Sequence, residues 1–212
     1  MSLNFQNIFL NYTPYINGSE RYKKAAVILP FVTIDTDTVK PTDNIYILFE
    51  KRAKNLRTHP GQICFPGGRI ELNETPLQAA LRESFEELNL KNDSINIITP
   101  LDLFISPFNV LIHPFLAEIH NIDSIIINPS EVEEIVYIPL SFFLETEPQR
   151  YTNAIQLVPN DDFPYEMVPD KKNHQFDIGS YEILFYDYNG IIIWGLTARI
   201  LHNFICYFKA NC

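Results

Sequence analysis

One segment, from Thr75 to Asn89, contains a helix start, an acidic stretch and a helix end in direct succession. Thr75 and Gln78 form a capping-box pattern around Pro76, and proline is favoured at the first helical position because it has no N–H to leave unpaired. Asn89 suits the left-handed conformation in which many helices end. We therefore predict a helix from about Pro76 to Leu88.

The predicted helix separates its apolar residues from its glutamates. At about 100° per residue, the side expected to face the core carries Leu77, Ala80, Leu81, Ser84, Phe85 and Leu88. Glu83, Glu86 and Glu87 stand at i, i+3 and i+4, so we expect them to cluster on a different face. Ala79 lies one turn before Glu83, where its small side chain leaves space. Since each like-charged pair on a helix costs only about a few tenths of a kcal/mol, a solvated face tolerates this cluster. The helix alone does not establish a metal site.

The residues before the helix, Phe65–Glu74, read FPGGRIELNE. Gly67 and Gly68 permit positive φ and close backbone approach. A glycine-rich turn that leads into an acidic helix can place carbonyl and carboxylate oxygens around a hard cation. Oxygen-rich, partly open sites suit Mg²⁺ or Mn²⁺, which keep bound water and bind substrate phosphates. The two segments together predict a site for one of these ions.

The stretch from Gly68 to Leu90 resembles the Nudix box, G-x5-E-x7-R-E-U-x-E-E-x-G-U. It departs from that pattern at Ser84, which replaces an aliphatic residue, and at Asn89, which replaces the last glycine. Asparagine tolerates the left-handed conformation, and neither departure touches a charged position. The chain is therefore similar to the Nudix hydrolase superfamily.

The resemblance implies roles for the matching residues. Mg²⁺ or Mn²⁺ would be bound by the carboxylates of Glu83, Glu86 and Glu87 and by the backbone carbonyl of Gly68. Arg82 would orient the carboxylates through charge-assisted hydrogen bonds, and Glu74 would support that arrangement. Glu83, Arg82 and Glu74 are thus the implied catalytic residues.

The resemblance also implies an α/β (α+β) fold class, as a Nudix α/β/α sandwich around a central mixed β-sheet. The element pattern agrees, because strands and helices alternate without βαβ regularity. Strands are predicted at Ala25–Phe31, Ile45–Phe49, Leu101–Ile105, Pro114–Ile119, Val132–Ile138, Tyr181–Tyr186 and Ile191–Trp194. The Asn-Gly pair at Asn189–Gly190 predicts a hairpin turn, and Leu196–Phe208 follows a helical period.

The chain of 212 residues is long enough for one domain with a sizeable core. We expect residues 25–212 to form a single domain. Residues 1–24 are expected to form a lead-in with a short helix, since Phe5, Ile8, Phe9 and Tyr12 recur at helical spacing. The region from Thr146 to Asp177 is rich in proline, aspartate and asparagine, and is either a long loop over the site or an irregular surface connection.

The net charge of −10 predicts a surface that repels nucleic acid and anionic membranes. No apolar run approaches the ~20 residues that a membrane span needs, and we expect no signal peptide. Cys64, Cys206 and Cys212 are odd in number and widely spaced, so we expect reduced thiols rather than disulfides or a zinc site. These features predict a cytoplasmic protein that binds neither nucleic acid nor membranes. The resemblance implies a small nucleotide as its partner. A homodimer is left open.

Between Lys51 and Arg69 every charged residue is basic. Such a segment is either a solvated basic loop or a local anion site in front of the metal-binding turn. Leu48–Gly68 resembles the coenzyme A pyrophosphatase signature, L-L-T-x-R-S/A-x3-R-x3-G-x3-F-P-G-G, with departures at Phe49 and Glu50. The substrate-binding residues proposed on this basis are Arg52, Arg57, His59 and Arg69.

The implied reaction is metal-assisted hydrolysis of coenzyme A or an acyl derivative to 4′-phosphopantetheine and 3′,5′-ADP. The base is left open between Glu83 and the acids Glu131, Glu133 and Glu134, which are otherwise expected to be surface residues. Two alternatives stand beside this function. One is hydrolysis of another nucleoside diphosphate derivative or nucleotide, such as NADH, ADP-ribose or a nucleoside triphosphate. The other is a non-catalytic ligand sensor, although such proteins commonly lose box carboxylates that this chain retains.

Overall fold

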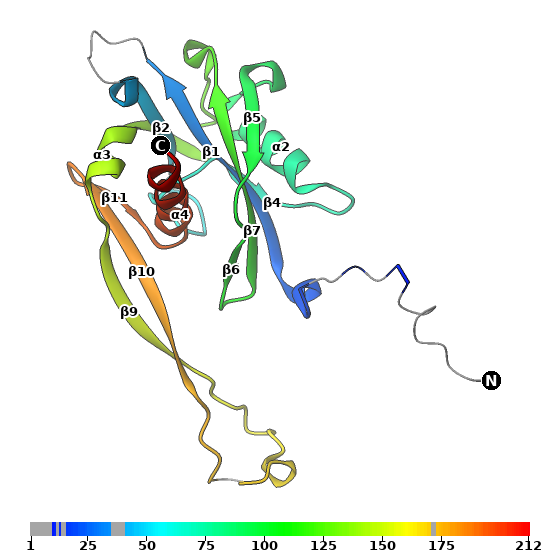
Figure 1. The fold of residues 1–212 in the computed structure, drawn as a ribbon. Coiled ribbons are helices and arrows are strands. Elements are labelled where there is room, and N and C mark those ends of the chain that lie inside the picture. Colours follow the sequence, from blue (N-terminus) through cyan, green and yellow to red (C-terminus); the bar gives the residue numbers. More distant parts are fainter. Residues whose placement is uncertain (1–9, 12, 14–15, 35–40, 171–172) are drawn as a thin grey trace.

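The structure is a computed structural model, in which residues 10–11, 13, 16–34, 41–170 and 173–212 are described (Figure 1). The short helix predicted around Phe5, Ile8, Phe9 and Tyr12 lies outside these residues. Within the described ranges, each helix is too short or too polar to span a bilayer.

A mixed sheet of eight strands forms the centre of the molecule. Its strands are β1 (Lys23–Thr33), β2 (Ile45–Arg52), β3 (Ile63–Cys64), β4 (Gly67–Arg69), β5 (Ile95–Pro100), β6 (Phe104–Ser106), β7 (Val110–Ile119) and β8 (Val132–Pro139). The main path runs β3-β2-β1-β7-β5, and β4, β6 and β8 pair with β1, β7 and β2 respectively. β1 and β7 run parallel, whereas the other pairs are antiparallel. The predicted mixed sheet is confirmed.

Helices cover both faces of this sheet (Figure 1). The remaining elements are α2 (Pro76–Leu88), α3 (Leu140–Glu145), α4 (Gly195–Asn211), β9 (Gln149–Gln156), β10 (Ile178–Tyr188) and β11 (Ile191–Trp194). Alternate residues of β1 point to opposite faces, so Ala26 and Ile28 join the core under α2, and Val27 and Leu29 join the core under α4. The α/β/α sandwich is therefore confirmed, with the three-stranded sheet β11-β10-β9 added on the α4 side.

Along one edge, β1 pairs first with β4 and then with β2. It pairs with β4 through Ala25–Val27 and with β2 through Phe31–Thr33. β4 and β2 therefore separate from each other between these pairings. At this fork the backbone N–H of Gly67 donates to Oε2 of Glu87 at 2.9 Å, so a helix side chain completes the hydrogen bonding of the sheet.

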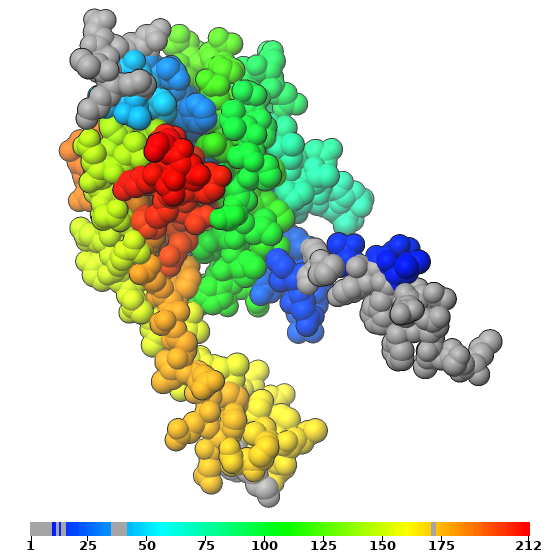
Figure 2. All heavy atoms as spheres, viewed as in Figure 1, coloured from blue at the N-terminus to red at the C-terminus, as the bar shows by residue number. Residues whose placement is uncertain are grey.

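β9 and the first half of β10 form a hairpin arm that projects from the body of the molecule (Figures 1 and 2). Nearly all of β9 is exposed, and the connection from β9 to β10 includes the short 3₁₀ turn Tyr165–Met167. The region predicted to be irregular from Thr146 to Asp177 therefore begins with a strand at Gln149–Gln156. Its sequence carries little strand signal because its polar side chains face solvent, and pairing with β10 supplies its hydrogen bonds.

Most predicted strands are present with longer bounds, but the strand predicted at Leu101–Ile105 is wrong over most of its length. The chain pairs with β7 as β5 up to Pro100 and again as β6 from Phe104, so residues 101–103 belong to neither strand. The register of β5 shifts between Ile97 and Thr99, which carries the chain out of the regular ladder ahead of β6. The Asn189–Gly190 hairpin turn is confirmed, with φ of 53° and 86° as a tight two-residue turn requires.

The bounds predicted for the acidic helix are confirmed, and α4 contains the helix predicted from Leu196 to Phe208. The assignment of faces on α2 is wrong at two positions. Phe85 is 49% exposed, whereas Glu87 is 2% exposed and lies among the buried residues Ala80 and Ser84. A helical period locates the faces of a helix, but it does not reveal that a carboxylate will accept a hydrogen bond from the sheet beneath it.

Candidate metal centre

Both ends of α2 are fixed by local hydrogen bonds. The Thr75 hydroxyl oxygen accepts from the Gln78 backbone N–H at 3.3 Å, and the Gln78 side-chain oxygen accepts from the Thr75 N–H at 2.9 Å. Asn89 adopts the left-handed conformation at φ 53° and donates its N–H to the Phe85 carbonyl. These caps fix where the helix begins and ends. They therefore also fix which part of the sheet its glutamates face.

Two glycines allow the sheet and the helix to approach closely. Gly67 has φ 140°, and a Cβ atom there would overlap the backbone of Ala26 and Val27. A Cβ atom on Gly68 would overlap the carboxyl group of Glu83. The Glu83 carboxylate therefore lies directly against the β4 backbone, in space that any side chain at Gly68 would fill.

Arg82 forms the hydrogen-bonding hub of the acidic face. Its Nε donates to Oε1 of Glu74 at 2.9 Å, and its Nη1 lies 2.9 Å from Oε1 of Glu83 and 3.0 Å from Oε2 of Glu86. Nη2 donates to the backbone carbonyl of Arg69 at 3.0 Å, which fixes the guanidinium to the glycine-rich turn. The hydrogen bonds from Arg82 hold the pKa of Glu74 below its ordinary value. Arg82 thus has the contacts needed to orient Glu83 and Glu86.

The structure brings a carboxylate from another element to the helix. Oxygens of Glu83, Glu87 and Glu131 all lie within 4.8 Å of one another. Glu131 stands just before β8, where its backbone carbonyl accepts from the Ala53 N–H at 2.8 Å. From the sequence, Glu131 could not be distinguished from the other acids near the start of this strand. The structure distinguishes it, because it lies next to Glu83 and Glu87.

Glu133 and Glu134, the neighbouring acids of that stretch, pair with lysines. Glu133 lies 3.2 Å from Lys51 and 3.0 Å from Lys54, and Glu134 lies 2.8 Å from Lys51. The lysines lower the pKa of Glu133, Lys54 more than Lys51. These contacts match surface acids, and they leave Glu131 as the member of the stretch that reaches α2.

Glu86 lies at the rim of the cluster. Its side chain is 47% exposed, and its carboxylate is held by Arg82. It does not belong to the close group formed by the other two box glutamates and Glu131. The expected convergence therefore holds for Glu83 and Glu87, while Glu86 stands toward solvent.

The electrostatics of the cluster call for a compensating cation. Burial is the main cause that raises the pKa of Glu83, and the neighbouring acids raise it further against the opposing effect of Arg82. Burial also raises the pKa of Glu87, with the charge of Glu50 as the next cause. Carboxylates crowded in this way repel each other and are poorly solvated. Because every donor in the group is a hard oxygen, the residues fit Mg²⁺ or Mn²⁺ rather than a softer metal.

Glu50 is a member of this region that sequence analysis did not identify. It lies on β2, is 1% exposed, and its Oε1 accepts from the Cys64 thiol at 3.4 Å. Burial raises its pKa, opposed by the thiol and by Arg52. The available signal was that Glu50 directly follows the apolar run Ile45–Phe49 and departs from the signature upstream of the box.

The proposed substrate-binding residues divide into two groups. Arg52 is half-buried, with its charge acting on Glu50. Arg57, His59 and Arg69 are exposed, and His59 adopts a left-handed backbone conformation at φ 54°. Arg52 thus lies beside the acidic cluster, and the side chains of the other three residues face solvent.

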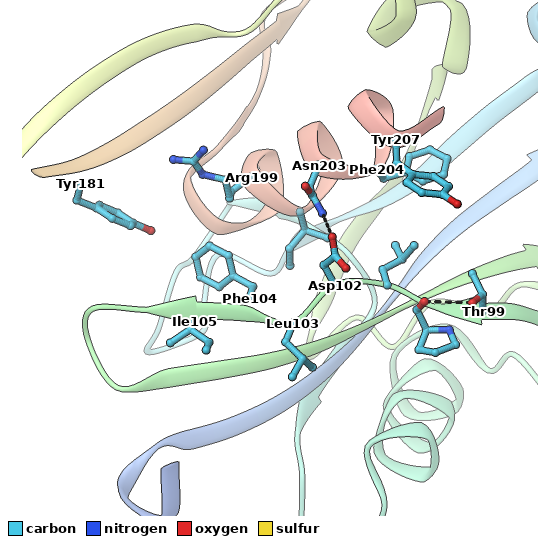
Figure 3. Close-up of a pocket in the computed structure, with 13 residues that line it drawn as sticks. Thr99, Asp102, Leu103, Phe104, Ile105, Tyr181, Arg199, Asn203, Phe204 and Tyr207 are labelled. Atoms are coloured by element: carbon cyan, nitrogen blue, oxygen red, sulfur yellow. Dashed lines mark hydrogen bonds between the residues drawn. The ribbon is translucent and has the colours of Figure 1, made fainter. Parts of the chain in front are cut away.

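A cavity of about 690 Å³ lies on the other side of the sheet, between α4, β10 and the connection from β5 to β6 (Figure 3). Phe104, Tyr181 and Tyr207 line it. Two of its polar side chains are paired, because Asn203 donates to Asp102 at 2.9 Å and Arg199 lies 3.2 Å from Glu182. Since the central sheet separates this cavity from the glutamates of α2, we assign it no part in their chemistry.

The family model described as the NUDIX domain matches residues 33–168, more than half of the chain. Nudix hydrolase 3 from Caenorhabditis elegans is 27% identical over 89% of this chain and 74% of that protein. A protein named uncharacterized Nudix hydrolase NudL, from Photorhabdus laumondii, is 30% identical over 87% of this chain and 84% of its own length.

A third relative carries a more specific name. The peroxisomal coenzyme A diphosphatase ndx-8 from Caenorhabditis elegans is 37% identical over 49% of this chain and 46% of that protein. The likeness to this relative thus spans about half of each chain.

Proposed function

The chain belongs to the Nudix hydrolase family, and from this premise we propose that it is a Mg²⁺- or Mn²⁺-dependent pyrophosphohydrolase acting on coenzyme A or an acyl derivative. The reaction would break the phosphoanhydride bond, with 4′-phosphopantetheine and 3′,5′-ADP as products. A water molecule would supply the oxygen that forms the new bond to phosphorus.

One observation carries the metal-dependent part of this proposal. Carboxylate oxygens of Glu83, Glu87 and Glu131 lie within 4.8 Å of one another. The Glu83 carboxylate lies against the backbone at Gly68, where the absence of a side chain leaves room for it. When bound, a divalent cation supplies charge compensation for the pyrophosphate and lowers the pKa of bound water. The residues that would hold it are the carboxylates of Glu83, Glu86, Glu87 and Glu131 with the carbonyl of Gly68.

The protein side chains have two further tasks. Arg82 holds Glu83 and Glu86 in place through hydrogen bonds of 2.9 and 3.0 Å and is itself anchored by Glu74. A carboxylate must accept the proton of the attacking water, and the proposed acceptors are Glu83 and Glu131. Both are partly exposed, so water reaches them, whereas Glu87 is buried.

The coenzyme A assignment has separate support. The relative named as a coenzyme A diphosphatase matches about half of the chain. Coenzyme A carries a 3′-phosphate besides its pyrophosphate, so it needs more positive charge than a plain nucleoside diphosphate. On a chain of net charge −10, the proposed sources of that charge are Arg52, Arg57 and Arg69. His59 is proposed to bind the substrate beside them. Arginine suits phosphate because its planar fork donates two parallel hydrogen bonds.

Product chromatography after incubation with coenzyme A and Mg²⁺ tests the proposal. We expect 4′-phosphopantetheine and 3′,5′-ADP, and no products when a chelator removes the metal. A parallel panel of NADH, ADP-ribose and nucleoside triphosphates tests the specificity. Faster hydrolysis of a panel member would retain the pyrophosphohydrolase and reject coenzyme A. Absence of hydrolysis of every compound would favour the non-catalytic sensor.

A further inference from the structure

Glu50 is a buried carboxylate outside the Nudix box, and the box pattern assigns it no role. Strand alternation places Leu48 and Glu50 on the face of β2 that packs toward α2, and Leu48 contributes to the core there. Glu50 is 1% exposed, although glutamate is almost never fully buried without a partner. Its position therefore requires a compensating group.

Only one oxygen of Glu50 has a hydrogen-bond donor. Cys64 stands opposite Glu50 in the β2–β3 pairing, and its thiol donates to Oε1 at 3.4 Å. Oε2 is buried and accepts no hydrogen bond from the described part of the chain. Arg52, two residues further on β2, does not satisfy it, since Arg52 Nε also lacks an acceptor there. A thiol is a weak donor, so Glu50 is poorly compensated by its protein neighbours.

Glu50 lies close to the cluster described above. Its carboxyl group is within hydrogen-bonding reach of Glu87, and the charge of Glu131 also acts on it. Glu87 uses its Oε2 to accept from the Gly67 N–H at 2.9 Å. Two ionised carboxylates cannot hydrogen-bond to each other, because neither carries a proton to donate. A cation that both Glu50 and Glu87 contact removes this conflict.

We propose that Glu50 is a further carboxylate ligand of the metal centre, contributing Oε2 from the buried side to a cation that Glu87 also holds. This inference rests on the proposed metal-dependent function, and it adds a ligand that the box pattern does not contain. Cys64 is then a positioning residue, because its hydrogen bond occupies Oε1 and leaves Oε2 available to the cation. The thiol acts here as the donor to Glu50, so Cys64 is not counted among the ligands.

The rival explanation is a structural pair, in which Glu50 and Glu87 share a proton whether or not metal is present. The two explanations differ in metal affinity. A ligand contributes to binding of the ion, so its loss weakens binding. A structural pair contributes to folding alone, so its loss leaves the affinity of the folded protein unchanged.

Mn²⁺ binding to the full chain separates these explanations. Free Mn²⁺ is measured by electron paramagnetic resonance during titration, and the rise in thermal unfolding temperature with Mn²⁺ is recorded beside it. Glu50→Gln is expected to bind Mn²⁺ at least about tenfold more weakly and to lose most of the metal-induced rise. The matched control is Glu134→Gln, since Glu134 pairs with Lys51 outside the cluster and should leave both readings unchanged. Glu83→Gln serves as the variant expected to weaken binding in any case.

The outcomes distinguish this inference from the proposed function. If the wild type binds no Mn²⁺, the metal-dependent function fails, and the role of Glu50 fails with it. If the wild type binds Mn²⁺ and Glu83→Gln weakens binding, but Glu50→Gln matches the wild type, the role of Glu50 alone is overturned. Should Glu50→Gln fail to fold, Glu50→Thr replaces it, because a β-branched residue suits a strand and carries no ligand carboxylate. The same weakening is expected, and wild-type affinity in that variant overturns the inference.

Cys64 offers an independent check. Cys64→Ser keeps a donor opposite Glu50 and should keep Mn²⁺ affinity within about twofold of the wild type, whereas Cys64→Ala removes the donor and should weaken binding by several fold. Equal affinity in the two variants would reject the positioning role of the thiol.

Discussion

The backbone N–H of Asn128 donates to the carbonyl oxygen of Glu87 at 2.8 Å, and this bond ties the loop before β8 to the last turn of α2. A second bond, from the Ile126 N–H to the Leu88 carbonyl at 3.1 Å, strengthens the tie. Carbonyls at the end of a helix have no partner within the helix, so they are free to accept from another segment. The loop satisfies them and delivers Glu131 to the glutamates of α2.

Loss of a ligand charge at the centre should abolish turnover without unfolding the protein. Glu83→Gln is expected to lower kcat at least about 100-fold with coenzyme A at saturating Mg²⁺, because the amide keeps the size of the side chain but removes its charge. Steady-state kinetics would measure this, with circular dichroism to verify the fold. Near-normal turnover in Glu83→Gln would reject the assignment of Glu83.

A methyl group at Gly68 should damage both the fold and the site. The added Cβ would overlap the Glu83 carboxyl group, so Gly68→Ala is expected to lower the free energy of unfolding by about 1–3 kcal/mol and to weaken Mn²⁺ binding. Urea unfolding and metal titration would measure the two effects. Gly179→Ala is the matched control, because a Cβ there meets only Ile155 O, at an ordinary contact distance of 3.7 Å. Equal stability of the two variants would contradict the close approach at Gly68.

The metal-free protein should become less stable as pH rises. Burial raises the pKa of Glu50 from 4.5 to about 7, and burial also raises the pKa of Glu87. A pKa that is higher in the folded state means that the folded state binds the proton more tightly than the unfolded state does. The resulting stabilisation is complete below about pH 4.5 and is lost as the pH rises through about 7.

Urea unfolding in the presence of a chelator, at a series of pH values, would test this dependence. The free energy of unfolding should fall across that window in the wild type and fall less steeply in Glu50→Gln. Addition of Mg²⁺ or Mn²⁺ should oppose the fall, since a bound cation favours the ionised carboxylates. If the free energy of unfolding of the metal-free wild type stayed level or rose with pH, the raised pKa values of Glu50 and Glu87 would be contradicted.

Arg57 should distinguish substrates by their 3′-phosphate. Arg57→Ala is expected to raise the KM for coenzyme A more than the KM for its dephospho form, since only the former carries the group that Arg57 would contact. Initial-rate kinetics with both compounds would measure the two ratios. Lys54→Ala is the control, because Lys54 is an exposed neighbour that pairs with Glu133 at 3.0 Å. An equal increase in KM for both substrates would place Arg57 away from the 3′-phosphate.

The parts of the fold that local sequence controls were predictable. The bounds of α2 follow from a capping box at Thr75 and a left-handed residue at Asn89, and both signals act within one helical turn. The hairpin turn at Asn189–Gly190 is predictable for the same reason, since two residues with positive φ determine it. Strand positions were less accurate where a register shift, as between Ile97 and Thr99, depends on the partner strand.

The parts of the candidate site that depend on distant contacts were not predictable. Glu131 joins the cluster through backbone bonds between its loop and α2, and no local pattern encodes them. The burial of Glu87 depends on an N–H of β4, and the burial of Glu50 depends on its neighbours across β2, β3 and α2. The one local sign available for Glu50 was its position in β2 directly after the apolar run Ile45–Phe49, because a buried charge there needs compensation that the strand itself does not provide.

The projecting arm of β9 and β10 is the part of the described chain where we expect a protease to cut first. The connection between β9 and β10 lies at the outer end of the arm (Figure 2) and includes the exposed residues Val158 and Met167, so cleavage should begin there. Leu184 and Ile193 lie in the core under α4 and would hold the C-terminal fragment to the body after the cut. A nicked protein would thus consist of two fragments that remain associated, with the glutamates of α2 all on the N-terminal one.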